Sequence, residues 1–150
     1  MELQRRTALL DRLRDYGLDA SPPRAGMALP LIDLDAFFDG NDDARSIGPQ
    51  ISGAHPGIPA LRATLDEIAA REDVSHVLVE AQDAQWAYDS DDEWVVATRV
   101  VIVTSAGAAD IDGWKQRLGC AAAAKGFPEP LAPNAPALPD GHAAWQFVWT

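Results

Sequence analysis

The 150-residue sequence contains one cysteine, few basic residues and no long hydrophobic run. Cys120 has no second cysteine with which to form an intramolecular disulfide, and it has no neighbours at metal-ligand spacing, so a buried or incidental thiol is expected. No apolar stretch reaches the roughly 20 residues that span a bilayer. The charged segment 1–18 also lacks the apolar core of a secretory signal. These absences argue against a membrane partner and predict a soluble, cytoplasmic protein.

Acidic residues outnumber basic ones, with 23 Asp and Glu against 12 Lys and Arg, a formal charge of −11 and a pI near 4.4. Proteins that bind nucleic acid need Lys and Arg to neutralise phosphates, so nucleic acid is not an expected partner. The excess is localised: residues 25–93 hold 15 acids and three bases, whereas 1–24 carry a net charge of +1 and 94–150 a net charge of zero. Such a field can steer a basic protein, or it can simply keep the chain soluble.

Hydrophobic periodicity predicts a single domain over residues 1–150, with an N-terminal helix in 1–20, a proline-rich linker at 21–26 and an α+β core over 27–150. The order is typical of a mainly antiparallel sheet of about four strands packed against two to three helices. A three-layer arrangement with one parallel strand pair is the alternative. The expected helices cover 3–16, 58–72 and 108–118, and the expected strands cover 27–34, 75–82, 93–105 and 142–150.

Several local expectations follow from turn-forming residues and proline. Pro30 lacks a backbone donor, which places the first strand at a sheet edge or at a bulge. A single helical turn is expected at 35–38, and an acidic loop or twisted hairpin tip at 83–93. The alanine-rich segment 120–125 is expected to extend the third helix after a break, and 126–141 to cross the surface as an extended connector.

The segment 29–58 is the least generic part of the chain, because an apolar run is followed by an acidic segment with aromatic residues, a loop rich in Asp, Asn and Gly, and a His-Pro-Gly turn. Its spacing does not fit an EF-hand, and no Gly-rich nucleotide-binding motif is present, so no metal or cofactor is expected. Asp and Asn also favour turns and caps, which is the competing interpretation of every candidate ligand. The candidate oxygen ligands are Asp33, Asp35, Asp39, Asn41, Asp42 and Asp43.

His55 precedes a Pro-Gly turn and supports an alternative hypothesis, a small enzyme or a ligand- or metal-binding domain with its site in the 39–57 loop. In that hypothesis His55 is the base, and Asp42 or Asp43 orients it or ligates a metal. The competing interpretation is a histidine that fixes the turn by hydrogen bonding. Convergence of His55 with either aspartate in a concave pocket would favour the enzyme.

Three short motifs give the chain a resemblance to a known group of proteins. They are FFDGNDD with SIG at 37–48, HPG at 55–57 and VLVE at 77–80. Together they resemble a family of uncharacterised bacterial proteins over roughly residues 28–150, including a proline-rich connector and a Trp-bearing last strand. In the related pattern an Asn is expected where Pro49 or Gln50 stands, which suggests an altered loop. The resemblance implies a compact bacterial domain and no particular activity.

The leading hypothesis is an acidic protein-interaction module, most concretely an immunity protein that neutralises a basic bacterial toxin. It depends on the localised acidity, the small size and the lack of a catalytic motif. Aromatic residues among carboxylates favour a binding surface, since aromatics are enriched at interface hot spots. A homodimer formed through the last strand, 142–150, is a third hypothesis. The candidate partner-binding residues are Asp39, Asp42, Asp43, Trp86, Tyr88, Asp89, Asp91, Asp92 and Glu93.

Overall fold

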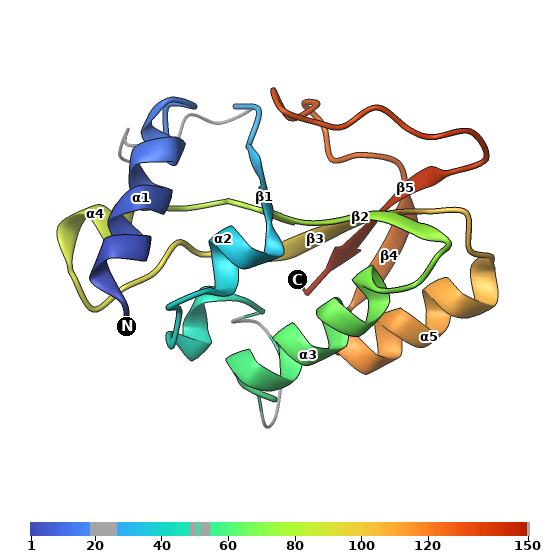
Figure 1. The fold of residues 1–150 in the computed structure, drawn as a ribbon, viewed down its shortest axis with the longest axis horizontal. Helices are drawn as coiled ribbons and strands as arrows, with labels where there is room; N and C mark the ends of the chain where they lie inside the picture. Colours follow the sequence, from blue (N-terminus) through green and yellow to red (C-terminus); the bar gives the residue numbers. More distant parts are fainter. Residues whose placement is uncertain (19–26, 49–50, 52–54, 150) are drawn as a thin grey trace.

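A computed structural model describes residues 1–18, 27–48, 51 and 55–149, and the linker expected at 21–26 lies outside these residues. The described residues form an α+β fold with five helices and a five-stranded antiparallel sheet, which confirms the predicted class (Figure 1). The helices are α1 Leu3–Arg14, α2 Leu34–Phe38, α3 Ile58–Ala69, α4 Gln85–Asp89 and α5 Ala108–Leu118, with a short 3-10 turn, η1, at Ala44–Ser46. The strands are β1 Leu31–Asp33, β2 Val74–Glu80, β3 Arg99–Thr104, β4 Ala122–Lys125 and β5 Ala143–Val148.

The sheet has the order β1-β2-β3-β5-β4, and each of its strand pairs is antiparallel. The three-layer alternative with a parallel strand pair is therefore wrong for this sheet. Strand β1 is at one edge, directly after Pro30, as the missing proline donor predicts. Strand β5 lies between β3 and β4, so both of its hydrogen-bonding edges are used and a second copy of the chain cannot pair with it.

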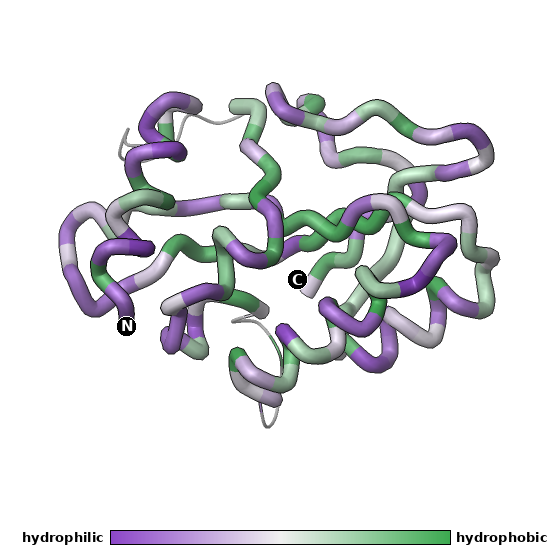
Figure 2. Tube along the Cα trace, viewed as in Figure 1, coloured by the Kyte–Doolittle hydropathy of each residue, from purple (hydrophilic) through white to green (hydrophobic). Residues whose placement is uncertain are grey.

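The two faces of the sheet have different covers because side chains alternate along each strand. The helices pack on one face, where they bury the main core, and the connector 126–141 crosses the other face (Figure 1). Figure 2 shows hydrophobic stretches along the central strands and hydrophilic stretches on α1 and the outer turns. The helix face buries Ile32, Val79, Ile102 and Phe147, and the connector face buries Leu31, Val101, Val103, Ala132 and Ala144.

Asn134 attaches the connector to the free edge of β1. Its side-chain oxygen accepts from the Leu31 backbone N–H at 2.9 Å, and its side-chain nitrogen donates to the Leu31 carbonyl at 2.6 Å. One side-chain amide thus replaces the pairing that a further strand would make at this residue. Because unpaired edges are templates for unwanted strand pairing, this contact closes the β1 edge at Leu31.

One local expectation is wrong. The segment 120–125 does not extend a helix, because Gly119 ends α5 in the left-handed conformation (φ 71°) and the following alanines pair with β5 as β4. Sheet pairing here overrides the helix propensity of alanine. The segment 83–93 joins the antiparallel pair β2 and β3, as expected, with Asp83 bridged to Val96, and it also contains the helical turn α4. None of the helices in the described part of the chain has the length and apolarity to cross a membrane.

Glu80, the last residue of β2, is a buried carboxylate. Its effect on the stability of the fold can be tested through the dependence of unfolding on pH. Glu80 is 6% exposed, and its ion pair with Arg99 is long, at 3.8 Å. Burial raises the pKa of the Glu80 carboxyl, with Arg99 opposing the change. Folding therefore disfavours the ionised group, and this penalty disappears as the pH falls and the folded protein takes up a proton.

Glu80→Gln is consequently expected to raise the free energy of unfolding near neutral pH, and this gain should shrink as the pH is lowered from neutral toward the usual titration range of a glutamate carboxyl. Urea unfolding across that range measures it, with Glu72→Gln as the same chemical change at an exposed position. A variant that is less stable than the wild type at every pH would show instead that the pair with Arg99 stabilises the fold.

Candidate functional site

The structure brings two acidic segments together, 39–43 and 89–93, which are about 50 residues apart in the sequence. Asp43 Oδ2 accepts from the Trp94 backbone N–H at 3.2 Å, and Arg45 forms an ion pair with Glu93 at 3.1 Å. A surface hollow of about 320 Å³ lies at this junction, lined by Asp43, Arg45, Glu93 and Val96. We call the resulting patch the acidic surface. It consists of Asp39, Asp42, Asp43, Asp89, Asp91, Asp92 and Glu93.

The first acidic segment is held by a network of buried polar groups. Asn41 is 7% exposed and donates to Ser46 Oγ at 2.9 Å, while its side-chain oxygen accepts from the Asp43 N–H at 2.9 Å. Asp43 Oδ1 in turn accepts from the Arg45 N–H at 3.1 Å, which caps η1. Gly40 has φ 80°, and a Cβ there would lie 2.7 Å from Glu2 Cβ, so only glycine lets the start of α1 approach. These contacts assign Asn41 and Asp43 a structural role.

Arg6 of α1 holds the second acidic segment, and it is buried although it carries a charge. Its side chain is 7% exposed, its Nε donates to the Glu93 carbonyl at 2.8 Å, and its Nη2 donates to the Ser90 carbonyl. Its Nη1 lies 3.7 Å from Asp91 Oδ1. The missed signal is positional, since Arg6 precedes the buried Leu9, Leu10 and Leu13 by three, four and seven residues.

Two aromatic residues of this region, Tyr88 and Trp94, serve packing. Tyr88 donates its hydroxyl to the Leu10 carbonyl at 2.6 Å, and the Arg14 guanidinium lies 5.5 Å from the centre of its ring. Trp94 is 1% exposed and belongs to the core. Trp86 is in α4, and its side chain lies outside the described part of the structure. Tyr88 therefore attaches α4 to α1.

Four carboxylates of the acidic surface are directed to solvent. The side chains of Asp91 and Asp42 are 84% and 68% exposed, and Asp89 and Asp92 are also exposed. Asp42 accepts from the α-amino group of Met1 at 2.8 Å, and this hydrogen bond lowers the pKa of the Asp42 carboxyl. Arg6 holds the backbone of 89–93 through the carbonyls of Ser90 and Glu93. The exposed carboxylates of this segment therefore extend from a backbone that is held in place.

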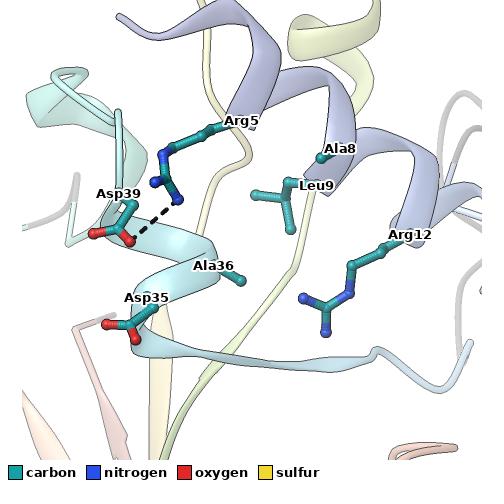
Figure 3. Close-up of a pocket in the computed structure, with 7 residues that line it drawn as sticks. All are labelled: Arg5, Ala8, Leu9, Arg12, Asp35, Ala36 and Asp39. Atoms are coloured by element: carbon teal, nitrogen blue, oxygen red, sulfur yellow. Dashed lines mark hydrogen bonds and ion pairs between the residues drawn. The ribbon is translucent and has the colours of Figure 1, made fainter.

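Asp39, at the end of α2, lies beside a groove between α1 and α2. Figure 3 shows Arg5 and Arg12 extending from α1, with Asp35 and Asp39 opposite on α2. The groove has a volume of about 110 Å³, and Arg5 crosses it to Asp39 at 3.3 Å. Arg62 of α3 also binds Asp39, at 2.6 Å, and this contact raises the pKa of the Arg62 guanidinium. These ion pairs join three helices and leave Asp39 neutralised, so it contributes little free charge.

His55 is engaged at both ring nitrogens by backbone groups. Its Nε2 lies 2.8 Å from the Ile47 carbonyl, and its Nδ1 accepts from the Gly57 N–H at 2.9 Å. This pattern fixes the neutral tautomer with the proton on Nε2. Neither bond involves Asp42 or Asp43, whose own hydrogen bonds go to Met1 and to backbone N–H groups. The arrangement closes the HPG turn ahead of α3 and does not resemble a base with its orienting carboxylate.

The described residues hold no cluster of three or more His, Cys, Asp or Glu side chains that could bind a metal ion. Pro49 and Gln50, where the related loop pattern differs, lie outside these residues. Cys120 is 9% exposed, and burial raises the pKa of its thiol to about 12. The thiol is therefore protonated at neutral pH and is a poor nucleophile.

The fold and surface define an α+β protein whose antiparallel sheet is covered by helices on one face and whose acidic surface surrounds the start of α1. A family model matches residues 4–147, and the chain belongs to that family, the Uncharacterized protein YfbO family. The expectation of an uncharacterised family is thereby confirmed. Comparison with curated proteins and with solved structures found no match.

Asp43→Ala tests the role of Asp43 in joining the two segments. Its side chain is 8% exposed and accepts two backbone hydrogen bonds, so its loss is expected to lower the free energy of unfolding by about 2 kcal/mol. Asp91→Ala removes an exposed carboxylate of the same surface and is expected to change stability by less than about 0.5 kcal/mol. Urea unfolding compares them, and equal losses would contradict the structural role of Asp43.

Proposed function

We propose that this protein is an acidic protein-interaction module that binds a basic protein through the acidic surface. Its most concrete form is an immunity protein that neutralises a basic bacterial toxin. The observation that carries the proposal is the joining of 39–43 to 89–93 on one side of the molecule. Because these segments belong to the region that holds all of the excess negative charge, their union concentrates that charge at one place.

Anchoring of the surface supports binding by a preorganised site. The Arg6 guanidinium holds the 90–93 backbone, and the Asn41 network holds the 41–46 turn. A partner would meet carboxylates on fixed backbone, so little conformational entropy is lost on binding. Basic groups of the partner would face Asp89, Asp91 and Asp92, which extend to solvent. A field of this kind raises the association rate and suppresses acidic competitors.

Several acids outside the acidic surface form ion pairs with arginine. Arg71, just after α3, forms a two-pronged pair with Asp73 at 2.9 Å and a further pair with Asp110 of α5 at 3.4 Å, and Arg117 of α5 binds Glu67 of α3 at 2.6 Å. These acids are locally neutralised by arginine.

Capture of partners on the immobilised protein tests the proposal. A lysate of the source bacterium at about 0.05 M salt is expected to yield a specific basic protein, which is released at about 0.5 M salt because the screening length falls. Recovery of no specific partner, or of one whose binding ignores salt, would overturn the electrostatic proposal.

The toxin-neutralising form has its own test in cells. The reading frame that neighbours this gene is expressed alone and together with this protein. Growth arrest by the neighbour alone, relieved by co-expression of the wild type but not of a variant with a neutralised acidic surface, is the expected result. An unaffected culture, or relief by both forms, would argue against an immunity function that acts through this surface.

A further inference from the structure

The two edges of the sheet are treated differently by the rest of the chain. Asn134 bonds both backbone groups of Leu31, which closes the β1 edge there. At the opposite edge, β4 pairs with β5 on its inner side. Within the described residues, no backbone hydrogen bond from outside the sheet reaches Ala123 or Lys125. The β4 edge therefore offers free pairing groups.

The register of β5 identifies which backbone groups of β4 face outward. The Trp149 N–H donates to the Thr98 carbonyl, so the residues of β5 that face β3 are odd-numbered and those that face β4 are even-numbered. The Gly126 N–H donates to the Ala144 carbonyl at 2.7 Å, in agreement with this alternation. The inward-facing residues of β4 are thus Ala122 and Ala124, and the outward-facing ones are Ala123 and Lys125.

The composition of β4 leaves the edge open to a second strand. Natural edges are protected by proline, bulges or charges that point toward an incoming strand. Strand β4 has three alanines followed by a single charge, Lys125, and the side chains of Ala122 and Ala124 are exposed. A hollow of about 500 Å³ begins at Lys125, and Leu131 in its lining is 61% exposed. An apolar group thus lies beside the open backbone.

The charge distribution favours a second copy of this chain as the occupant. Residues 94–150, which contain β4 and α5, carry a net charge of zero, so two such ends do not repel one another. Figure 1 shows β4 and α5 toward one end of the long axis and α1 and α4 toward the other. Two copies joined at β4 would therefore keep their acidic surfaces far apart and accessible.

We propose that β4 is a self-association edge, at which two copies pair in antiparallel orientation around a two-fold axis at Ala124. The outward-facing groups then match, because Ala123 of one copy lies opposite Lys125 of the other, and the reverse. Each such pair exchanges two backbone hydrogen bonds. The lysines face alanines, so no like charges are opposed in this register. The result is one continuous sheet through both copies, built by an isologous contact.

Sedimentation velocity over a concentration series tests the proposal. The wild type is expected to shift toward twice 16.1 kDa as its concentration rises. Ala124→Glu places two carboxylates directly opposite one another at the axis and is expected to weaken self-association by about fivefold or more. Ala122→Glu is the matched control, since it adds the same charge on the same face of β4 but lies opposite Gly126 of the partner subunit. It should dimerise more tightly than Ala124→Glu.

A charge-swapped pair makes the register itself testable. Ala124→Glu mixed with Ala124→Lys is expected to form a heterodimer, although each variant alone is weakened. A wild-type protein that stays monomeric at every concentration would overturn the proposal. The β4 edge would then be a binding site for an extended segment of another protein instead. A dimer that Ala124→Glu leaves intact, or a mixture that forms no heterodimer, would also overturn the proposal, because the contact would lie elsewhere.

Discussion

Replacing Arg6 with alanine is expected to lower the free energy of unfolding by about 2 to 4 kcal/mol. The guanidinium is buried, and it donates to the carbonyls of Ser90 and Glu93, which the truncation leaves without these donors. The same change frees the 89–93 backbone, so amide hydrogen exchange there should accelerate. Urea unfolding and hydrogen exchange measure the two effects.

Two further variants separate the geometry of Arg6 from its charge. Arg6→Lys retains the charge, but a single ammonium does not reproduce the planar fork, so an intermediate loss is expected. Arg5→Ala removes a neighbouring arginine that is 54% exposed and forms only surface ion pairs, and its loss should stay below about 1 kcal/mol. If Arg6→Ala were no more destabilising than Arg5→Ala, the anchoring role would be refuted.

Neutralising the exposed part of the acidic surface is expected to have the largest effect on binding. The triple variant Asp89→Asn, Asp91→Asn and Asp92→Asn should slow association with the captured basic partner by about tenfold at low salt. Its association rate should converge on that of the wild type as salt rises, because screening removes the long-range attraction. Stopped-flow association across a salt series measures this.

A control triple variant has the same formal charge as the first triple variant, but its three substitutions lie outside the acidic surface. Asp112→Asn, Glu129→Gln and Asp140→Asn also alter three exposed acids and bring the formal charge from −11 to −8. It should associate nearly as fast as the wild type. Equal slowing by both triples would mean that net charge, and not the acidic surface, governs association.

The sequence predicted the bounds of helices and strands best where one side of the element is apolar and packs against a single layer. The expected helix at 108–118 has the bounds of α5, and the expected last strand contains β5, because amphipathic periodicity and alternation reflect packing against a single layer. Pro30 correctly indicated an edge strand through its missing donor. These elements follow from local patterns.

Long-range contacts decide the features that sequence reasoning missed. Residues 122–125 form a strand because β5 offers an edge beside Gly119, although alanine favours helices. Arg6 is buried because two carbonyls more than 80 positions away accept from it. Asn134 closes the β1 edge from 103 positions away. Periodicity in a short window contains no information about such distant partners.

The candidate site was located by charge and not by motif. The charge count selected residues 25–93, and the structure joins two parts of that region through Asp43 and Arg45. The same count did not distinguish Asp43, whose oxygens cap backbone groups, from Asp91, which extends to solvent. The two aspartates differ because Asp43 lies in a hydrogen-bonded turn. That turn is held by the buried side chain of Asn41, whose oxygen accepts from the Asp43 N–H.

Hydrogen–deuterium exchange of the protein with and without its captured basic partner tests the central claim most directly. Binding through the acidic surface predicts protection of the backbone amides of 39–43 and 89–93, with β4 and the connector 126–141 unchanged. Protection confined to β4 or to the connector, with the two acidic segments unaffected, would contradict the claim.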